Sequence, residues 1–194
     1  MNVRVMVVDE SPARAELLRQ ALIEVGYRVV ACIGPDEHIP TRVRDTQPDV
    51  IIIDVDSPDR DTLEHLCVID HDQPRPVVLF THDDDRHKIR AAMRAGVSAY
   101  VVRGLSNERV QPVIEVAMAR FQEFQAMRRR LDQANVSLAE RKRIERAKGI
   151  LMKSRGCAED EAYRLLRKMA MDRGKRVADI ADTLIAAQDL LSQG

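Results

Sequence analysis

The chain has 194 residues, of which 45% are hydrophobic and 32% are charged, and its formal net charge is zero. This length and composition indicate a soluble protein of one or two domains that can bury a core. The composition excludes a membrane-spanning chain, because no apolar run approaches the ~20 residues needed to cross a bilayer. Three cysteines without metal-ligand spacing, and an N-terminus without a signal-peptide pattern, predict reduced thiols in a cytoplasmic protein.

The first half of the chain alternates short apolar runs with amphipathic segments. The expected strands are residues 3–8, 28–33, 50–53, 77–80 and 99–102, and the expected helices are residues 12–26, 36–45, 61–70, 84–95 and a helix from about 107. All-apolar strands that alternate with helices predict a five-stranded parallel sheet covered on both faces. The sequence therefore predicts an α/β fold of the flavodoxin-like type.

Acidic residues follow two of these strands. Asp9 and Glu10 come after the first strand, and Asp54 comes after the third. The carboxyl ends of parallel strands meet at one edge of a sheet, so we expect the three carboxylates to cluster there. Clustered carboxylates repel one another unless a hard cation is present, and Mg²⁺ is the natural one for oxygen ligands. The sequence thus predicts a magnesium site formed by Asp9, Glu10 and Asp54.

A long helix is expected from residue 111 to about residue 155. Positions 114, 117, 121, 124, 128, 131, 135 and 138 follow a 3-4 spacing, and six of the eight are apolar. This spacing favours a parallel coiled coil in a homodimer, with Arg128 and Asn135 as polar positions that fix its register. The alternative is an amphipathic helix that packs on its own domain.

Three helices are expected in the C-terminal part: the end of the long helix, residues 158–173 and residues 177–191. Gly149 lies inside a helix, where glycine is unfavourable, so we expect another helix to pack closely against it. Four alanines are also expected to be close-packing residues: Ala147, Ala162, Ala170 and Ala181. The architecture predicted here is a small three-helix bundle joined to the α/β domain by a coiled-coil-like helix.

The net charge of zero conceals a strongly basic segment. Residues 141–176 hold 13 Lys/Arg and five Asp/Glu, a net charge of +8, whereas residues 1–140 and 177–194 carry net charges of −5 and −3. A basic block beside acidic ones indicates a polyanion-binding surface. The alternative is a solvated helix surface.

The last 55 residues or so resemble the ANTAR domain, an RNA-binding antitermination domain. The resemblance is carried by residues that include Ile144, Ala147, Lys148, Gly149, Leu151, Met152, Glu161, Leu165 and Ala170. It implies an RNA-binding protein rather than an enzyme. The basic residues expected to contact RNA are Lys142, Arg143, Arg146, Lys148, Lys153, Arg155, Arg167 and Lys168.

Residues 3–122 resemble the receiver domain of two-component response regulators. The resemblance implies Asp54 as the phosphoacceptor, Asp9 and Glu10 as Mg²⁺ ligands, Thr81 as the residue that binds the phosphoryl group, and Tyr100 as the aromatic switch. Arg103 departs from the family, which usually has a lysine at this position. A planar guanidinium does not replace a lysine conservatively, so a pseudo-receiver that is controlled by a docked partner remains open beside a phosphorylated receiver.

Three further segments, at 56–66, 72–81 and 95–105, resemble NasT-type nitrate-assimilation antiterminators. The resemblance implies a receiver at 1–123, an ANTAR domain at 124–194 and a helical linker at about 111–140. It also implies that the protein binds leader-RNA hairpins, prevents terminator formation, and has a nitrate/nitrite-sensing partner. One alternative is a response regulator activated by a histidine kinase. A DNA-binding regulator is the other, but residues 177–191 lack Lys and Arg, which argues against a basic recognition helix.

Overall fold

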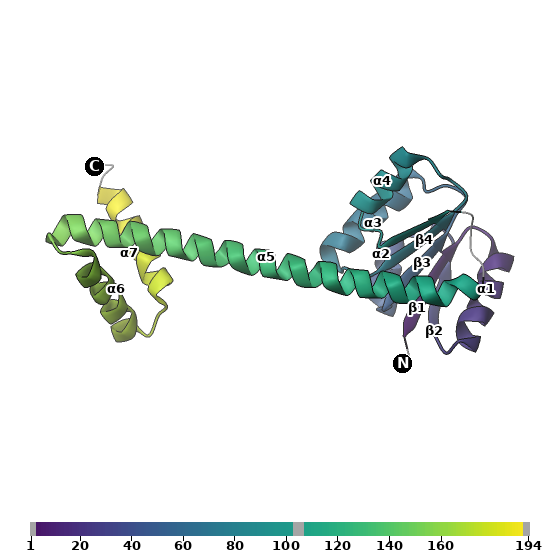
Figure 1. Ribbon diagram of the computed structural model, residues 1–194, viewed down its shortest axis with the longest axis horizontal. Helices are drawn as coiled ribbons and strands as arrows, with labels where there is room; N and C mark the ends of the chain where they lie inside the picture. The colour runs from purple at the N-terminus through teal and green to yellow at the C-terminus, as the bar shows by residue number, and fades with distance from the viewer. Residues whose placement is uncertain (1–2, 103–106, 192–194) are drawn as a thin grey trace. The chain divides into compact units, whose positions relative to one another are not determined.

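The computed structural model describes residues 3–102 and 107–191. It divides into two compact units, with the division between Gln125 and Ala126. The strands of the first unit are β1 (Arg4–Asp9), β2 (Arg28–Ile33), β3 (Val50–Asp54), β4 (Val77–Thr81) and β5 (Ala99–Val102) (Figure 1). The helices between them are α1 (Pro12–Glu24), α2 (Ile39–Thr46), α3 (Arg60–Asp72) and α4 (Arg86–Arg94), and α5 (Asn107–Arg155) follows β5.

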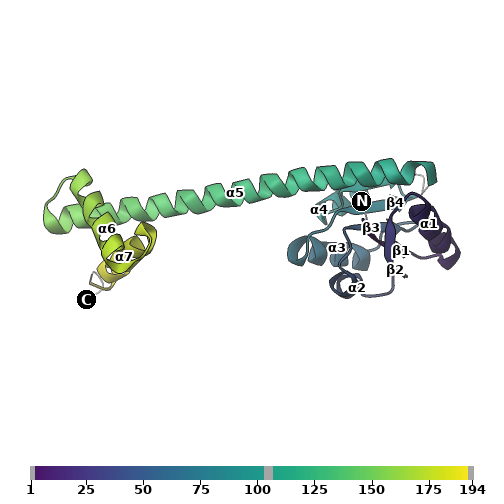
Figure 2. The same cartoon turned by 90° about the horizontal axis from the view of Figure 1, so that it is seen from below.

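The five strands form one parallel sheet in the order β2-β1-β3-β4-β5, as the alternating pattern predicted. Helices α2, α3 and α4 pack on one face, around Met6, Ile51 and Leu79. Helices α1 and α5 pack on the other face, around Val7 and Phe80. Figure 2 shows α5 lying over the sheet on the side away from α2 and α3. The sheet is covered on both faces, as in flavodoxin-like folds.

The central strands are buried along their whole length because every residue of β3 and β4 faces a helical layer. The carboxyl ends of β1 and β3 are in register, so that Asp9 at the end of β1 pairs with Asp54 at the end of β3. Helix α2 begins three residues later than predicted. The His38 side chain accepts a hydrogen bond from the Thr41 amide as the N-cap, and Pro40 occupies the first turn, where a missing N–H costs nothing.

The second unit contains the later part of α5, α6 (Glu159–Arg173) and α7 (Val177–Leu191). Its core includes all four alanines that were predicted to pack closely, and each is less than 5% exposed: Ala147, Ala162, Ala170 and Ala181. Small side chains at these positions let the three helices approach one another. Among the helices of the described residues, none is both long enough and apolar enough to cross a membrane.

Two predictions about α5 were wrong. Ile114 and Ala117, expected in a dimer seam, are completely buried in the core of their own α/β unit, so they are not available to a second chain. Gly149 was expected to be packed against another helix, yet a methyl group built there would meet no atom within 4 Å. Close packing within this unit therefore does not explain the glycine.

Candidate functional site

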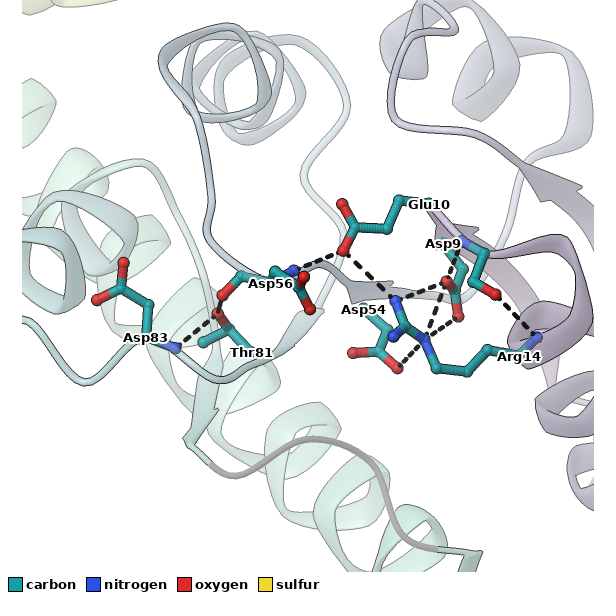
Figure 3. Close-up of polar contacts among 8 residues, drawn as sticks. Asp9, Glu10, Arg14, Asp54, Asp56, Thr81 and Asp83 are labelled. Atoms are coloured by element: carbon teal, nitrogen blue, oxygen red, sulfur yellow. Dashed lines mark hydrogen bonds and ion pairs between the residues drawn. The ribbon is translucent and has the colours of Figure 1, made fainter.

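An acidic cluster lies at the carboxyl edge of the sheet, where the sequence predicted it. Asp9 and Asp54 are each 3% exposed, whereas the Glu10 side chain is 40% exposed. Figure 3 shows the three carboxylates directed toward one place, which the guanidinium of Arg14 occupies. The parallel register of β1 and β3 explains why Asp9 and Asp54 come together.

Arg14 is the residue of this site that the sequence analysis missed. Its Nε lies 3.2 Å from both oxygens of Asp9 and 3.2 Å from Asp54 Oδ2, and its Nη2 lies 3.0 Å from Asp9 Oδ1 and 3.6 Å from Glu10 Oε1. The spacing from Glu10 to Arg14, four residues apart at a helix start, was the available signal. One arginine thus contacts all three acidic side chains.

The local sequence fixes where Arg14 stands. Ser11 is the N-cap of α1, its Oγ accepts a hydrogen bond from the Arg14 amide, and Pro12 follows in the first turn. Asp9 Oδ1 also accepts a 2.7 Å hydrogen bond from the Ser11 amide. Because side chains of a helix lean toward its N-terminus, an arginine in the first turn of α1 is directed toward the end of β1.

The surroundings of Asp54 in this cluster act on its pKa in opposite directions. Burial raises the pKa of the Asp54 carboxyl, and the nearby charges of Asp9 and Glu10 raise it further, while Arg14 acts in the opposite direction. The hydrogen bond to Asp9 is the main cause that raises the pKa of Arg14. The carboxylates therefore hold the guanidinium in its charged form, and the guanidinium limits their mutual repulsion.

The oxygens of this cluster are of the type that binds Mg²⁺, but their arrangement does not fit a metal ion here. Arg14 lies between the carboxylates, and in the part of the chain that the structure describes no group of three His, Cys, Asp or Glu side chains could hold a metal. A guanidinium and a dication cannot share this space, because both need the same oxygen atoms.

A second polar network joins the loops after β3 and β4. The Thr81 hydroxyl, fully buried, donates to the Asp56 carbonyl at 2.7 Å and accepts from the Asp83 amide at 3.1 Å. The Asp56 amide in turn donates to Glu10 Oε1 at 2.8 Å (Figure 3). The half-buried Tyr100 hydroxyl donates to the Asp83 carbonyl at 2.9 Å. The network therefore connects Thr81 and Tyr100 to the acidic cluster through backbone groups. Arg103 lies outside the described residues.

Lys88 on α4 completes this network, and the sequence analysis had not identified it. Its Nζ donates to Asp83 Oδ2 at 2.6 Å and to Ser57 Oγ at 2.7 Å. Together with the Ser57 hydroxyl and the Asp85 amide, this ammonium group lowers the pKa of Asp83 to about 2. Through these hydrogen bonds, Asp83 in the loop after β4 is linked to Ser57 in the loop after β3.

The basic residues predicted to contact RNA fall into three groups in the second unit. Two of them pair with aspartates of α7: Arg143 Nη1 lies 2.7 Å from Asp182 Oδ2, and Arg146 Nη2 lies 2.6 Å from Asp189 Oδ1. Both pairs are exposed to solvent. Exposed pairs of this kind contribute about 0–1 kcal/mol, so they can exchange for another anion at small cost.

Lys148 is placed differently from the expectation that it faces RNA. It is only 8% exposed, and its Nζ lies 2.8 Å from Glu145 Oε1 and 2.6 Å from Glu159 Oε1. The hydrogen bonds to these two carboxylates raise the pKa of Lys148. The side chain therefore connects α5 to the first turn of α6, which the sequence could not reveal without the position of α6.

The remaining basic residues form the third group, which is exposed: Lys142, Lys153, Arg155, Arg167 and Lys168. Within the described residues, none of these five makes an ion pair with a carboxylate of the chain. On α5, residues 142, 146, 149 and 153 recur at spacings of four, three and four, which places Lys142, Arg146, Gly149 and Lys153 along one stripe. Gly149 is thus an open position inside a row of cations.

Two protein families match the chain, one in each unit. Residues 5–115 match the response regulator receiver domain, and residues 132–185 match the ANTAR domain. The chain is 32% identical over 190 residues to the transcriptional regulatory protein PdtaR of Mycobacterium tuberculosis, covering 96% of this chain and 93% of that protein. It is also 41% identical over 68 residues to the nitrate regulatory protein of Klebsiella oxytoca, covering 35% of this chain and 17% of that protein.

Solved structures resemble the first unit. A LuxR-family two-component response regulator from Aurantimonas superposes with a TM-score of 0.54 at 29% identity, over 61% of this chain and 86% of that one. A CheY-like receiver domain protein from Methanospirillum hungatei superposes with a TM-score of 0.56 at 18% identity, over 63% of this chain and 98% of that one. The second likeness concerns the fold alone.

Proposed function

The chain belongs to the response regulators that join a receiver domain to an ANTAR domain, and we propose that it controls transcription by binding hairpins in leader RNA so that a terminator does not form. We place the receiver at residues 1–123 and the RNA-binding domain at residues 124–194. The observation that carries the proposal is the group of five exposed cations in the second unit that make no ion pair among the described residues. Phosphates are the anions that such a surface attracts.

The acidic helix α7 supports RNA contact through α5 and α6. It contains three aspartates and neither lysine nor arginine, so it offers no cation of its own to a phosphate. By contrast, α5 presents the stripe of Lys142, Arg146, Gly149 and Lys153, and α6 adds the exposed Arg167 and Lys168. A helix without basic residues is a poor recognition helix for DNA, which disfavours the DNA-binding alternative.

A homodimer is the second part of the proposal, with a seam that differs from the one first expected. Met127, Leu131, Ala134 and Leu138 recur at spacings of four, three and four and are exposed, at 70%, 61% and 52% for Met127, Leu131 and Leu138. In this register, the apolar Met127 and Ala134 take the seam positions for which Arg128 and Asn135 were expected. A second copy of α5 that buried this stripe would form a two-stranded coiled coil, and two RNA-binding domains would then act on paired hairpins.

For the signal that regulates the protein, we propose a nitrate- or nitrite-sensing partner that holds it inactive. The similarity to the nitrate regulatory protein supports this assignment over a third of the chain. The second candidate is phosphorylation of Asp54 by a histidine kinase. The position of Asp54 at the end of β3, beside Asp9 and one strand from Thr81, favours that candidate, because receiver chemistry requires this arrangement.

RNA binding by the full-length protein tests the function. We expect binding to a two-hairpin leader RNA that weakens steeply as salt rises, and much weaker binding to unrelated duplex DNA at the same salt. The variant Lys153→Ala/Arg167→Ala should reduce RNA affinity, because it removes two exposed phosphate contacts. Its matched control is Arg44→Ala/Arg90→Ala, which removes the same charge from the receiver.

Equal loss of RNA affinity in both double variants would show that only net charge matters, and the proposed surface would be abandoned. Equal affinity of the wild-type protein for the hairpins and for duplex DNA would reject RNA as the specific ligand. Circular dichroism of each variant establishes that the helices remain folded.

A further inference from the structure

The acidic edge of the receiver already contains a cation, and that cation is part of the chain. Receiver domains typically use Mg²⁺ at this edge, where clustered carboxylates supply oxygen ligands. Here the guanidinium of Arg14 contacts Asp9, Glu10 and Asp54 at 3.0–3.6 Å. The Arg14 side chain remains 36% exposed, whereas those of Asp9 and Asp54 are 0% and 5% exposed.

The chemistry of the guanidinium suits this position. It stays charged at every physiological pH, and its planar set of N–H donors can reach several carboxylates at once. Asp9 receives contacts to both of its oxygens from Nε, and Asp54 receives one at 3.2 Å. Removal of the guanidinium would leave two buried carboxylates side by side without the cation that contacts both of them, which is an unfavourable arrangement.

We infer that Arg14 is the resident counter-ion of the acidic edge, and that Mg²⁺ binds there only in competition with it. A dication that entered would have to displace the guanidinium from Asp9 and Asp54, the two most buried ligands. The binding free energy of Mg²⁺ is therefore reduced by the cost of breaking those contacts. The guanidinium also offsets the repulsion among the three carboxylates when no divalent cation is present. This inference concerns the receiver alone and is independent of RNA binding.

The test compares Mg²⁺ binding to the full-length wild type and to Arg14→Gln, by isothermal titration calorimetry. The control is Arg19→Gln, which removes a charge from the same helix; among the described residues, Arg19 forms an ion pair with the exposed Glu16 alone. We expect Arg14→Gln to bind Mg²⁺ at least about tenfold more tightly than wild type, a change that corresponds to about 1.4 kcal/mol. The control should bind Mg²⁺ with wild-type affinity.

Thermal unfolding supplies a second measurement. Without Mg²⁺, Arg14→Gln should melt at a lower temperature than wild type, and added Mg²⁺ should restore the loss. Wild type and Arg19→Gln should respond little to the same addition. Wild-type affinity for Mg²⁺ equal to that of Arg14→Gln, or an equal thermal response in all three proteins, would overturn the inference.

If Arg14→Gln does not fold, Arg14→Lys keeps the inference testable. Lysine retains the charge but is a compact ammonium that cannot contact three carboxylates in one plane. Its Mg²⁺ affinity should exceed that of wild type. An Arg14→Lys protein that binds Mg²⁺ no more tightly than wild type would contradict the competition, and RNA binding by the same variants would be unaffected in either case.

Discussion

Lys148 Nζ lies 2.6 Å from Glu159 Oε1, so a side chain of α5 holds the first turn of α6. Glu145 provides a second carboxylate at 2.8 Å. Two basic residues of α5 that are five positions apart therefore have different surroundings. Lys148 is enclosed by carboxylates, whereas Lys153 is exposed. Their substitution should therefore have different consequences.

We expect Lys148→Met to lower the melting temperature of the protein, because Glu145 and Glu159 lose their shared partner. Lys153→Met should leave the melting temperature unchanged and weaken RNA binding, since it removes only a proposed phosphate contact. Thermal unfolding and RNA titration of both variants check this. Unchanged thermal stability of Lys148→Met, together with a large loss of RNA affinity, would restore Lys148 to the RNA-binding surface.

Gly149→Ala should change stability and RNA affinity in opposite directions. A methyl group at this position meets nothing within 4 Å, and alanine is favoured over glycine in a helix interior by about 1 kcal/mol. The variant should thus unfold at higher urea. If RNA approaches the backbone between Arg146 and Lys153, the methyl group should also weaken binding. RNA affinity equal to that of wild type would exclude a close approach there.

Leu131→Glu should prevent dimer formation, because it places a charge in the proposed seam of Met127, Leu131, Ala134 and Leu138. Val136→Glu is the matched control: Val136 is also apolar and 59% exposed, but it lies five residues beyond Leu131, on the opposite side of the helix. Analytical ultracentrifugation with and without two-hairpin RNA measures the result. A wild-type protein that stays monomeric on saturating RNA would refute the coiled coil.

Asp54→Asn should retain most antitermination activity in cells. Arg14 occupies the site that a phosphoryl-bound cation would need, and Arg103 replaces the usual lysine, so phosphoryl transfer to Asp54 should be inefficient. Burial raises the pKa of Asp54, which means that its ionised form is a cost to the folded state at neutral pH. The neutral asparagine should consequently not reduce thermal stability. Reporter expression at matched protein abundance, with phosphate labelling of the wild type, decides between the two inputs.

The pKa of Asp83 should rise from about 2 toward the ordinary 3.8 in Lys88→Met, since the lysine hydrogen bond is the largest cause of the shift. A lowered pKa in the folded state stabilises the protein above the unfolded value, and that contribution is lost as pH falls from about 3.8 to about 2. The variant should therefore lack this part of the acid dependence. NMR titration of the carboxyl carbon measures it, with the exposed Arg90→Met on the same helix as the control.

The sheet and its acidic edge could be predicted because both depend on properties of local sequence. Runs such as Val50–Ile53 are apolar at every position, which indicates strands buried on both faces, and parallel strands bring Asp9 and Asp54 to one edge whatever the details of packing. The buried alanines of the second unit were predictable for a similar reason, since they recur on the inner faces of helices.

The features that could not be predicted depend on where long side chains go after the helices have packed. The four-residue spacing from Glu10 to Arg14 is compatible with a surface pair, and only the orientation of α1 over the sheet brings Arg14 to Asp54. The sequence did not distinguish Lys148 from the other basic residues of α5, because its pairing with Glu159 depends on the position of α6. Likewise, a 3-4 spacing cannot distinguish Ile114, which packs inside its own domain, from Leu131, which is exposed.

The covalent attachment of the Arg14 guanidinium to the chain has a thermodynamic consequence. A guanidinium attached to the first turn of α1 has an effective concentration that is set by the length of its own side chain, and dilution or chelation cannot change it. The positive charge at this edge of the sheet is consequently supplied by a residue of the chain and does not depend on binding a free ion. When no divalent ion is bound, the carboxylates of this edge therefore still have a positive partner.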